Sequence, residues 1–272
     1  MVNARRGWAP RILIGIALAY IGILILWPVA AIFQGAFAQG VDAALAILTL
    51  PDVQQAFLLT IELAAVAVMV NGVLGTVVAW VLVRQNFRGR SILNGLIDLP
   101  FVVSPVIAGY MIILLFGRQG WFNGLVQATG FPVAFALPGM LLVTIFVSLP
   151  FTIREIMPVL KHIGLEPEQA AYTMGASPWL TFRRVTLPAI RWGLLYGLTL
   201  TLARALGEFG AVLVVGGAII GHTETATLYI YRALDQRQYV GAYTASVVLA
   251  VLSFVILIGM ELLRKRTEVE QA

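Results

Sequence analysis

Long apolar runs separated by short polar segments dominate the chain. Six runs are long enough to cross about 30 Å of hydrocarbon as helices, and they lie near residues 12–33, 58–83, 96–116, 137–158, 193–217 and 241–263. The gaps between them are too short to hold a separate soluble domain. The pattern therefore predicts an all-α polytopic integral membrane protein, in which residues 1–272 form a single transmembrane domain.

Composition supports a membrane protein rather than a globular domain with one anchor. Sixty per cent of the residues are apolar, only 11% are charged, and the mean hydropathy is +0.92, whereas a soluble domain has about 25% charged residues. The chain has no cysteine and only two histidines, so neither a disulfide framework nor a metal site is expected. The net charge of +5 is dispersed among loops, which does not suggest nucleic acid as a partner. Membrane lipid is the expected surrounding.

The basic residues predict the orientation of the chain in the membrane. If the N-terminus lies inside, most of the 18 basic residues fall on cytoplasmic segments: Arg5, Arg6, Arg11, Arg84, Arg88, Arg90, Arg154, Lys161, Arg183, Arg184, Arg191, Arg264, Lys265 and Arg266. Cytoplasmic segments of membrane proteins carry such an excess. We therefore expect a multi-pass protein of the bacterial plasma (inner) membrane with both termini in the cytoplasm, as well as the polar loop 159–191.

The N-terminal segment has some features of a signal peptide. Basic residues precede an apolar run, and Ala36-Phe37-Ala38 imitates a cleavage site. The run is, however, longer than a signal peptide requires, and it contains Trp27-Pro28. We expect an uncleaved first span; cleavage would leave the remaining topology unchanged.

The longest polar interruption, residues 166–188, is predicted to form two short helices joined by a turn. Pro167 suits the first position of one helix, and Gly175 is a natural end for it. Ser177 can cap the second helix, with Pro178 at its first position. The first helix is expected to present one flat side that another protein could approach closely, formed by Ala170, Ala171 and Met174.

This interruption resembles the EAA loop of ABC importer permeases. In that family Glu-Ala-Ala is followed by three residues, Gly, nine residues and Ile-x-Leu-Pro. Here Gln169-Ala170-Ala171, Gly175 and Val185-Thr186-Leu187-Pro188 keep every spacing, with Gln169 in place of the Glu and Val185 in place of the Ile. The resemblance implies the type I ABC importer permease fold. It also implies that this loop contacts an ATPase, through Glu168, Gln169, Ala170, Ala171, Gly175, Leu187 and Pro188.

Three further segments are similar to the sulfate permease subunits of this family. They are residues 99–109, 138–155 and 203–215. The resemblance implies import of sulfate or thiosulfate by a complex with three kinds of partner: an ABC ATPase dimer, a second related permease subunit and an external sulfate-binding protein. Molybdate permease subunits share much of residues 99–109 and 203–215, so molybdate or another oxyanion is the alternative substrate.

Charged residues inside a membrane span are costly and need a reason. Arg204 and Glu208 lie four residues apart in the fifth span and can pair on one helix face. One interpretation is that they line or gate a translocation path, with Arg204 attracting an anion. The other is a structural ion pair that locks two helices or two subunits. The sequence leaves both open.

The third span contains Ser104-Pro105. Proline lacks a backbone N–H, so Pro105 should kink or break the helix and free carbonyl groups near Ser104. Broken helices at membrane depth usually line cavities. Ser104 and Pro105 are therefore candidates for the wall of the path, and a simple packing kink is the alternative.

The chain is not expected to supply its own energy or chemistry. Neither of its two lysines, Lys161 and Lys265, lies in the Gly-rich pattern of a phosphate-binding loop, and no catalytic constellation is evident. We expect a permease subunit that binds no cofactor, with ATP and Mg²⁺ held by the partner ATPase. A secondary carrier that works without an ATPase is the alternative, and in such a carrier residues 166–188 would have no task.

Overall fold

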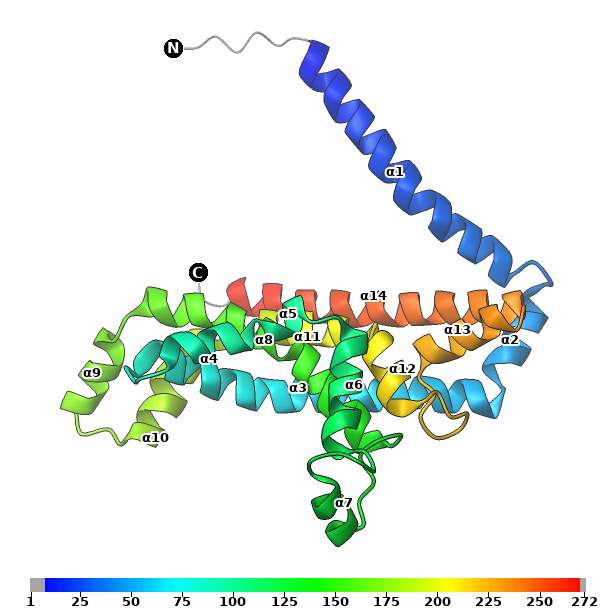
Figure 1. The fold of residues 1–272 in the computed structure, drawn as a ribbon. Coiled ribbons are helices and arrows are strands. Elements are labelled where there is room, and N and C mark those ends of the chain that lie inside the picture. The colour runs from blue at the N-terminus through cyan, green and yellow to red at the C-terminus, as the bar shows by residue number, and fades with distance from the viewer. Residues whose placement is uncertain (1–7, 270–272) are drawn as a thin grey trace.

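The computed structural model describes residues 8–269, and this part of the chain contains helices and no strands (Figure 1). Arg5 and Arg6 lie outside the described residues. The helices are α1 (Trp8–Ala36), α2 (Val41–Leu48), α3 (Pro51–Arg84), α4 (Arg90–Ile97), α5 (Leu99–Val102), α6 (Pro105–Phe116), α7 (Asn123–Thr129), α8 (Leu137–Ile163), α9 (Glu166–Thr173), α10 (Pro178–Thr181), the π-helix η1 (Phe182–Thr186), α11 (Leu187–Leu206), α12 (Gly210–Gly216), α13 (Ala226–Asp235) and α14 (Tyr239–Val269).

Within the described residues, five helical segments are long and apolar enough to cross a membrane, and a sixth span results if a bent pair is counted as one. The long helices α3, α8, α11 and α14 run side by side through the body (Figure 1). The all-α, polytopic architecture expected from the apolar runs is therefore confirmed.

The third span is broken where the sequence predicts it. Residues 90–102 and α6 meet at an angle of 114°, and Pro105 is the first residue of α6. Its missing N–H costs nothing there, because the first N–H groups of a helix have no partner within that helix. As a result α6 leaves the body sideways and carries α7 at its tip (Figure 1).

The fifth span differs from the expectation of one helix over residues 193–217. Helix α11 ends at Leu206, residues 207–209 are not helical, and α12 begins at Gly210. The Glu208 carboxylate explains the break, because its Oε1 accepts a hydrogen bond from the Ala211 backbone N–H (3.1 Å) and so starts a new helix. Arg204 thus lies in the last turn of α11 and Glu208 lies within the break, so the two are not on one continuous helix.

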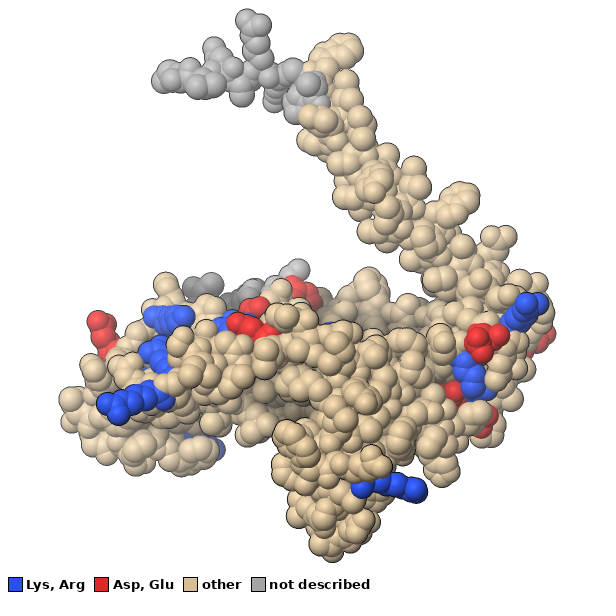
Figure 2. Space-filling model, in the orientation of Figure 1, with Lys and Arg blue, Asp and Glu red and all other residues tan. Residues whose placement is uncertain are grey.

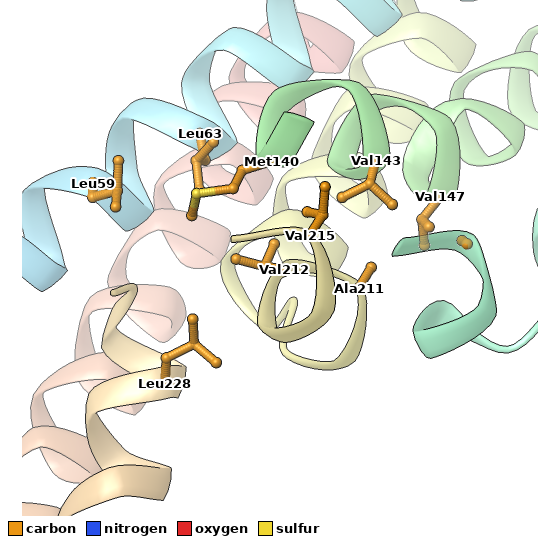
Figure 3. Close-up of a cluster of buried hydrophobic side chains, with 10 residues drawn as sticks. Leu59, Leu63, Met140, Val143, Val147, Ala211, Val212, Val215 and Leu228 are labelled. Carbon is orange, nitrogen blue, oxygen red and sulfur yellow. The ribbon is translucent and has the colours of Figure 1, made fainter. Parts of the chain in front are cut away.

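A buried apolar cluster holds α12 against the long helices (Figure 3). The side chains come from α3, α8, α12 and α13, and they include Leu59, Leu63, Met140, Val143, Val147, Ala211, Val212, Val215 and Leu228. Burial of this apolar surface fixes the position of the residues that follow the break.

Charge and exposure show how the body would sit in a bilayer. Charged side chains gather at the two ends of the body, and a broad uncharged region separates them (Figure 2). One end carries α9 and α10, and the other carries α2 and α13 (Figure 1). Helix α1 stands away from the body (Figure 1), and none of its most apolar stretch is buried within the chain.

Candidate coupling and translocation sites

The polar interruption forms an elbow at one end of the body, and we call residues 166–188 the elbow from here on (Figure 1). Helix α9 ends before Gly175, whose φ of +82° lies in the left-handed region that favours glycine. The Ser177 Oγ accepts a hydrogen bond from the Leu180 N–H at 3.3 Å, and Pro178 begins α10. Both helices and the turn predicted from the sequence are therefore present.

The inner side of α9 is formed by Glu168 and Ala171, which are only 7% and 5% exposed. This corrects the expectation that Ala171 shares an outward face with Ala170 and Met174. Residues three apart lie on one side of a helix, and here that side packs onto the body. The Glu168 side chain points inward as well, toward Arg84 and Thr186.

The outer side of the elbow is exposed and contains large apolar side chains. Gln169, Ala170 and Gly175 are exposed on it, and Met174 is 82% exposed. Trp179 is also 70% exposed, and it lines a cavity between the elbow and α3 together with Trp80. Trp179 stacks on Phe182 with ring centroids 5.9 Å apart. Leu187 and Pro188 follow at the start of α11, where Leu187 is half-buried and Pro188 is exposed. Clustered exposed apolar side chains beside a polar surface are typical of protein-binding sites.

Arg84, the last residue of α3, joins the elbow to two long helices. Its Nε lies 3.0 Å from Glu168 Oε2, and the two side chains are 5% and 9% exposed. Its other nitrogens donate to the backbone oxygens of Leu160 (3.1 Å) and Gly164 (2.7 Å) at the end of α8. The sequence counted Arg84 only among the cytoplasmic charges. No local spacing could have indicated the pair, because 84 positions separate Arg84 from Glu168 along the chain.

The candidate path residues meet at the break in the third span. A cavity of about 320 Å³ is lined by residues 100–105 together with Val147, Phe151 and Arg204. Ser104 is exposed beside Pro105, and the side chain of Arg204 is 28% exposed. The structure thus brings Ser104, Pro105 and Arg204 to one cavity, although they come from α11 and from the break before α6.

Glu208 pairs with Arg204 from beneath this cavity. Arg204 Nη1 lies 2.7 Å from Glu208 Oε2, and the Glu208 side chain is only 3% exposed. The second oxygen of Glu208 accepts the Ala211 N–H, and the Glu208 backbone oxygen accepts a hydrogen bond from the Thr227 hydroxyl at 2.7 Å. Glu208 therefore has partners on both carboxylate oxygens, whereas Arg204 presents a partly exposed cation to the cavity.

Two further charged clusters were missed by the sequence analysis. Arg154 makes a bidentate contact with Asp98 (2.8 and 2.6 Å) and also donates to Asn94, which joins α8 to α4. At the opposite end, Arg232 binds Glu224 at 2.5 and 2.9 Å. Each pair connects segments whose proximity is decided by the fold, so only the structure could reveal it.

The Glu224–Arg232 pair organises the end of the body that carries α13. Glu224 is only 2% exposed, and its hydrogen bond is the main cause that raises the pKa of Arg232 above the ordinary value. The guanidinium lies 5.2 Å from the centre of the Tyr229 ring, and burial is the main cause that raises the pKa of that phenol. The raised pKa values keep Arg232 charged and Tyr229 neutral near neutral pH, and the contacts of Arg232 with Glu224 and Tyr229 favour a fixed loop before α13.

In the described part of the chain, no group of three or more His, Asp or Glu side chains is placed to hold a metal ion. The polar side chains described above instead pair with one another. The arrangement presents a partly exposed cation at the cavity beside Ser104 and exposed apolar side chains on the elbow.

Comparisons with known proteins agree with these features. Residues 71–269 match the family described as the binding-protein-dependent transport system inner membrane component. The chain is 45% identical, over 98% of its length and 93% of the relative, to the sulfate transport system permease protein CysW of Synechococcus elongatus. It is 43% identical to the protein of the same name from Escherichia coli K12, over 96% of this chain and 90% of that protein.

A solved structure shares the fold at lower identity. A bacterial ABC transporter for the acidic polysaccharide alginate contains a chain that matches with a TM-score of 0.82 and 19% identity, over 96% of both chains. Another structure shows an alginate transporter in complex with an alginate-bound periplasmic protein, with a TM-score of 0.83, 20% identity and the same coverage. These matches confirm the expected importer permease fold.

Proposed function

Since this chain belongs to the family of binding-protein-dependent transport system inner membrane components, we propose that it is the transmembrane subunit of an ATP-driven importer for sulfate or thiosulfate. The observation that carries this proposal is the identity of 43–46%, over nearly the full chain, to three relatives named as CysW sulfate permeases. The match also covers 90–93% of the length of each of these relatives, so it is not confined to a shared segment.

The proposal includes three partners. An ABC ATPase dimer docks on the exposed side of the elbow, where Gln169, Ala170, Met174 and Gly175 are accessible. A second related permease subunit completes the path, and an external binding protein delivers the anion. The alginate transporter bound to its periplasmic protein supports this arrangement as an analogy at the level of fold. The chain holds no nucleotide itself, and ATP and Mg²⁺ stay on the ATPase.

The proposed path passes the cavity at Ser104, Pro105 and Arg204. Weak contacts suffice there, because an anion that is bound tightly would not leave. Arg204 offers a partly exposed positive charge, and its pairing with Glu208 reduces that charge so that the site attracts a dianion without trapping it. High selectivity then belongs to the external binding protein. Motion of the elbow driven by the ATPase would open the path to each side in turn.

The proposed location is the bacterial plasma (inner) membrane, with both termini and the elbow in the cytoplasm. The charge bias of the sequence supports this orientation. In the proposed orientation the Glu224–Arg232 pair is on the outer side, which is the side that the proposed binding protein approaches.

The test is uptake of labelled sulfate in cells that lack this chain and are complemented with it. Restored uptake that depends on a functional ATPase supports the proposal, and molybdate uptake measured in parallel tests the alternative oxyanion. Sulfate uptake that persists when the ATPase is inactivated would favour the secondary carrier. Restoration of molybdate uptake alone would replace sulfate as the substrate.

A further inference from the structure

We infer that Arg84, Glu168 and Thr186 form a buried clamp that makes the elbow and the long helices move as one body, so that these residues position the coupling surface instead of contacting the ATPase. We call this group the Arg84 clamp. The inference rests on the proposed ATP-driven import and adds to it a route by which force from the ATPase enters the membrane helices.

The clamp begins with a guanidinium that holds three segments together. Arg84 is the last residue of α3, its Nε faces Glu168 on α9, and its terminal nitrogens reach the carbonyls of Leu160 and Gly164. Leu160 lies in the last turn of α8 and Gly164 is the residue that directly follows this helix, and backbone oxygens at a helix C-terminus have no partner within the helix. A cation at this position is also favoured by the helix dipole. One side chain therefore fixes α9 relative to both α3 and α8.

The carboxylate of Glu168 extends the clamp to a fourth segment. Thr186 Oγ1 donates to Glu168 Oε1 at 2.8 Å, while the other oxygen, Oε2, faces Arg84. Thr186 is the last residue of η1 and directly precedes α11. Both carboxylate oxygens are thus occupied within the chain, and the side chain is buried. The Glu168 carboxylate therefore faces the body and not the exposed side of α9, where an ATPase would dock.

Without the Arg84 clamp, the short connection between α8 and α9 would transmit motion of α9 to α8 poorly. The two helices are joined only by Gly164 and Leu165, and Gly164 has a φ of +72°. A two-residue turn that includes glycine resists rotation poorly. The Arg84 clamp provides a second connection beside the turn, because a displacement of α9 acts on α3 and α8 directly through the contacts of Arg84. Helices α3 and α8 in turn pack extensively on each other and on α11, so the displacement reaches the helix that carries Arg204.

A purely stabilising role explains the clamp less well. Paired charges away from water gain little net stability, because desolvation offsets their attraction. What such a pair provides is one defined geometry, since each alternative arrangement leaves a buried charge without a partner. A defined angle between the elbow and the long helices is what coupling requires.

The first experiment measures hydrogen exchange in the purified full chain. Glu168→Gln removes the charge and keeps the shape, and Arg84→Gln removes the guanidinium together with its contacts to the Leu160 and Gly164 carbonyls. We expect exchange at residues 166–173 to rise by about tenfold or more in both variants, with the interiors of α3 and α8 unchanged. Glu166→Gln, in the exposed first turn of α9, and Arg88→Gln, an exposed arginine close to Arg84, are the matched controls. Unchanged exchange at residues 166–173 would overturn the inference whatever the substrate is.

The second experiment measures sulfate moved per ATP hydrolysed by the reconstituted complex. We expect the two clamp variants to assemble with the ATPase and to hydrolyse ATP, while sulfate moved per ATP falls by roughly 2- to 30-fold. The double variant should be no worse than the worse single variant, because both changes break one unit. Full coupling in the single variants, or loss of ATPase assembly, would overturn the inference. A wild-type complex that hydrolyses ATP but moves no sulfate would refute the proposed substrate instead, and the exchange result would still decide the clamp.

Discussion

Arg204 and Glu208 form one ion pair, but the two residues differ in their surroundings. Glu208 starts α12 and is almost fully buried, whereas Arg204 is partly exposed in the cavity beside Ser104. Removal of Arg204 alone would leave the Glu208 charge without its partner in a place where water is scarce, which is costly. A single substitution therefore cannot separate the two roles that the sequence left open.

A double variant that removes both charges separates the structural role of the ion pair from its role in transport. In Arg204→Gln/Glu208→Gln no unpaired charge remains, and residue 208 keeps an oxygen for the Ala211 N–H. We expect the double variant to fold, with a melting temperature in detergent close to wild type, and to take up sulfate about tenfold or more slowly, since a cation in a low-dielectric cleft raises the local anion concentration by such factors. Labelled sulfate uptake and thermal unfolding measure the two quantities. Wild-type uptake by the double variant would show that the ion pair serves structure alone.

Residue roles that depend on one chemical group were predictable, and roles that depend on neighbours were not. The left-handed turn at Gly175 and the cap at Ser177 follow from local chemistry, and both are present. Two glycines near the break, Gly207 and Gly210, give an example of the second kind. An added Cβ at Gly210 would lie 3.2 Å from Val106, but at Gly207 it would meet only Ala203 O at 3.7 Å. Which glycine lies against another helix is a property of the assembled fold.

At the scale of elements, the sequence predicted breaks from proline but missed a break made by a side chain. Pro105 divides the third span because proline cannot continue the backbone hydrogen bonds of α5. The break after Leu206 contains no proline. It depends on Glu208, whose carboxylate accepts a hydrogen bond from the Ala211 N–H in the first turn of α12. From sequence alone, a glutamate in an apolar run is interpreted as a charge that needs a partner, and its role at the start of a helix is missed.

The packing of α11 on α8 depends on a glycine and gives a test at this scale. An added Cβ at Gly197 would lie 2.8 Å from the Thr152 Cα, which is backbone and cannot turn aside. At Gly259 in α14, an added Cβ meets nothing within 4 Å. We expect Gly197→Ala to destabilise the protein by about 1–3 kcal/mol through overpacking. Gly259→Ala should be neutral or slightly stabilising, because alanine favours a helix by about 1 kcal/mol over glycine.

The two alanine variants are compared by thermal unfolding in detergent, and the fraction of the protein that remains monodisperse is measured at each temperature. Both place the same methyl group in the middle of a long apolar helix, so a change in helix propensity or detergent binding affects them alike. Equal melting temperatures for Gly197→Ala and Gly259→Ala would contradict the close contact between α11 and α8.

At the scale of the whole molecule, the long helices of the body pack on one another, whereas α1 leaves apolar surface uncovered within the chain. Most of α1 lies away from the other helices, and its described side chains are largely exposed and apolar (Figure 1). Its link to the body is at its C-terminal end, where Gly35 lies against Tyr243 of α14. The apolar run predicted this helix, but hydropathy is the same whether lipid or a second subunit covers it. Its placement therefore could not be foreseen from one chain.

The orientation of the molecule can be tested with cysteines, because the chain has none of its own. Met174→Cys would mark the elbow, where Met174 is 82% exposed, and Ile220→Cys would mark the loop before α13, where Ile220 is 46% exposed. We expect a membrane-impermeant maleimide to label Met174→Cys only in inside-out vesicles and Ile220→Cys only in right-side-out vesicles. The two positions lie at opposite ends of the body, so each variant is the control for the other. Prior assembly with the ATPase should shield Met174→Cys alone, because a protein that docks on the elbow covers that side chain and leaves the far end open. Labelling of Met174→Cys from outside the cell would place the elbow where cytoplasmic ATP cannot act on it, and ATP-driven import through this elbow would then be impossible.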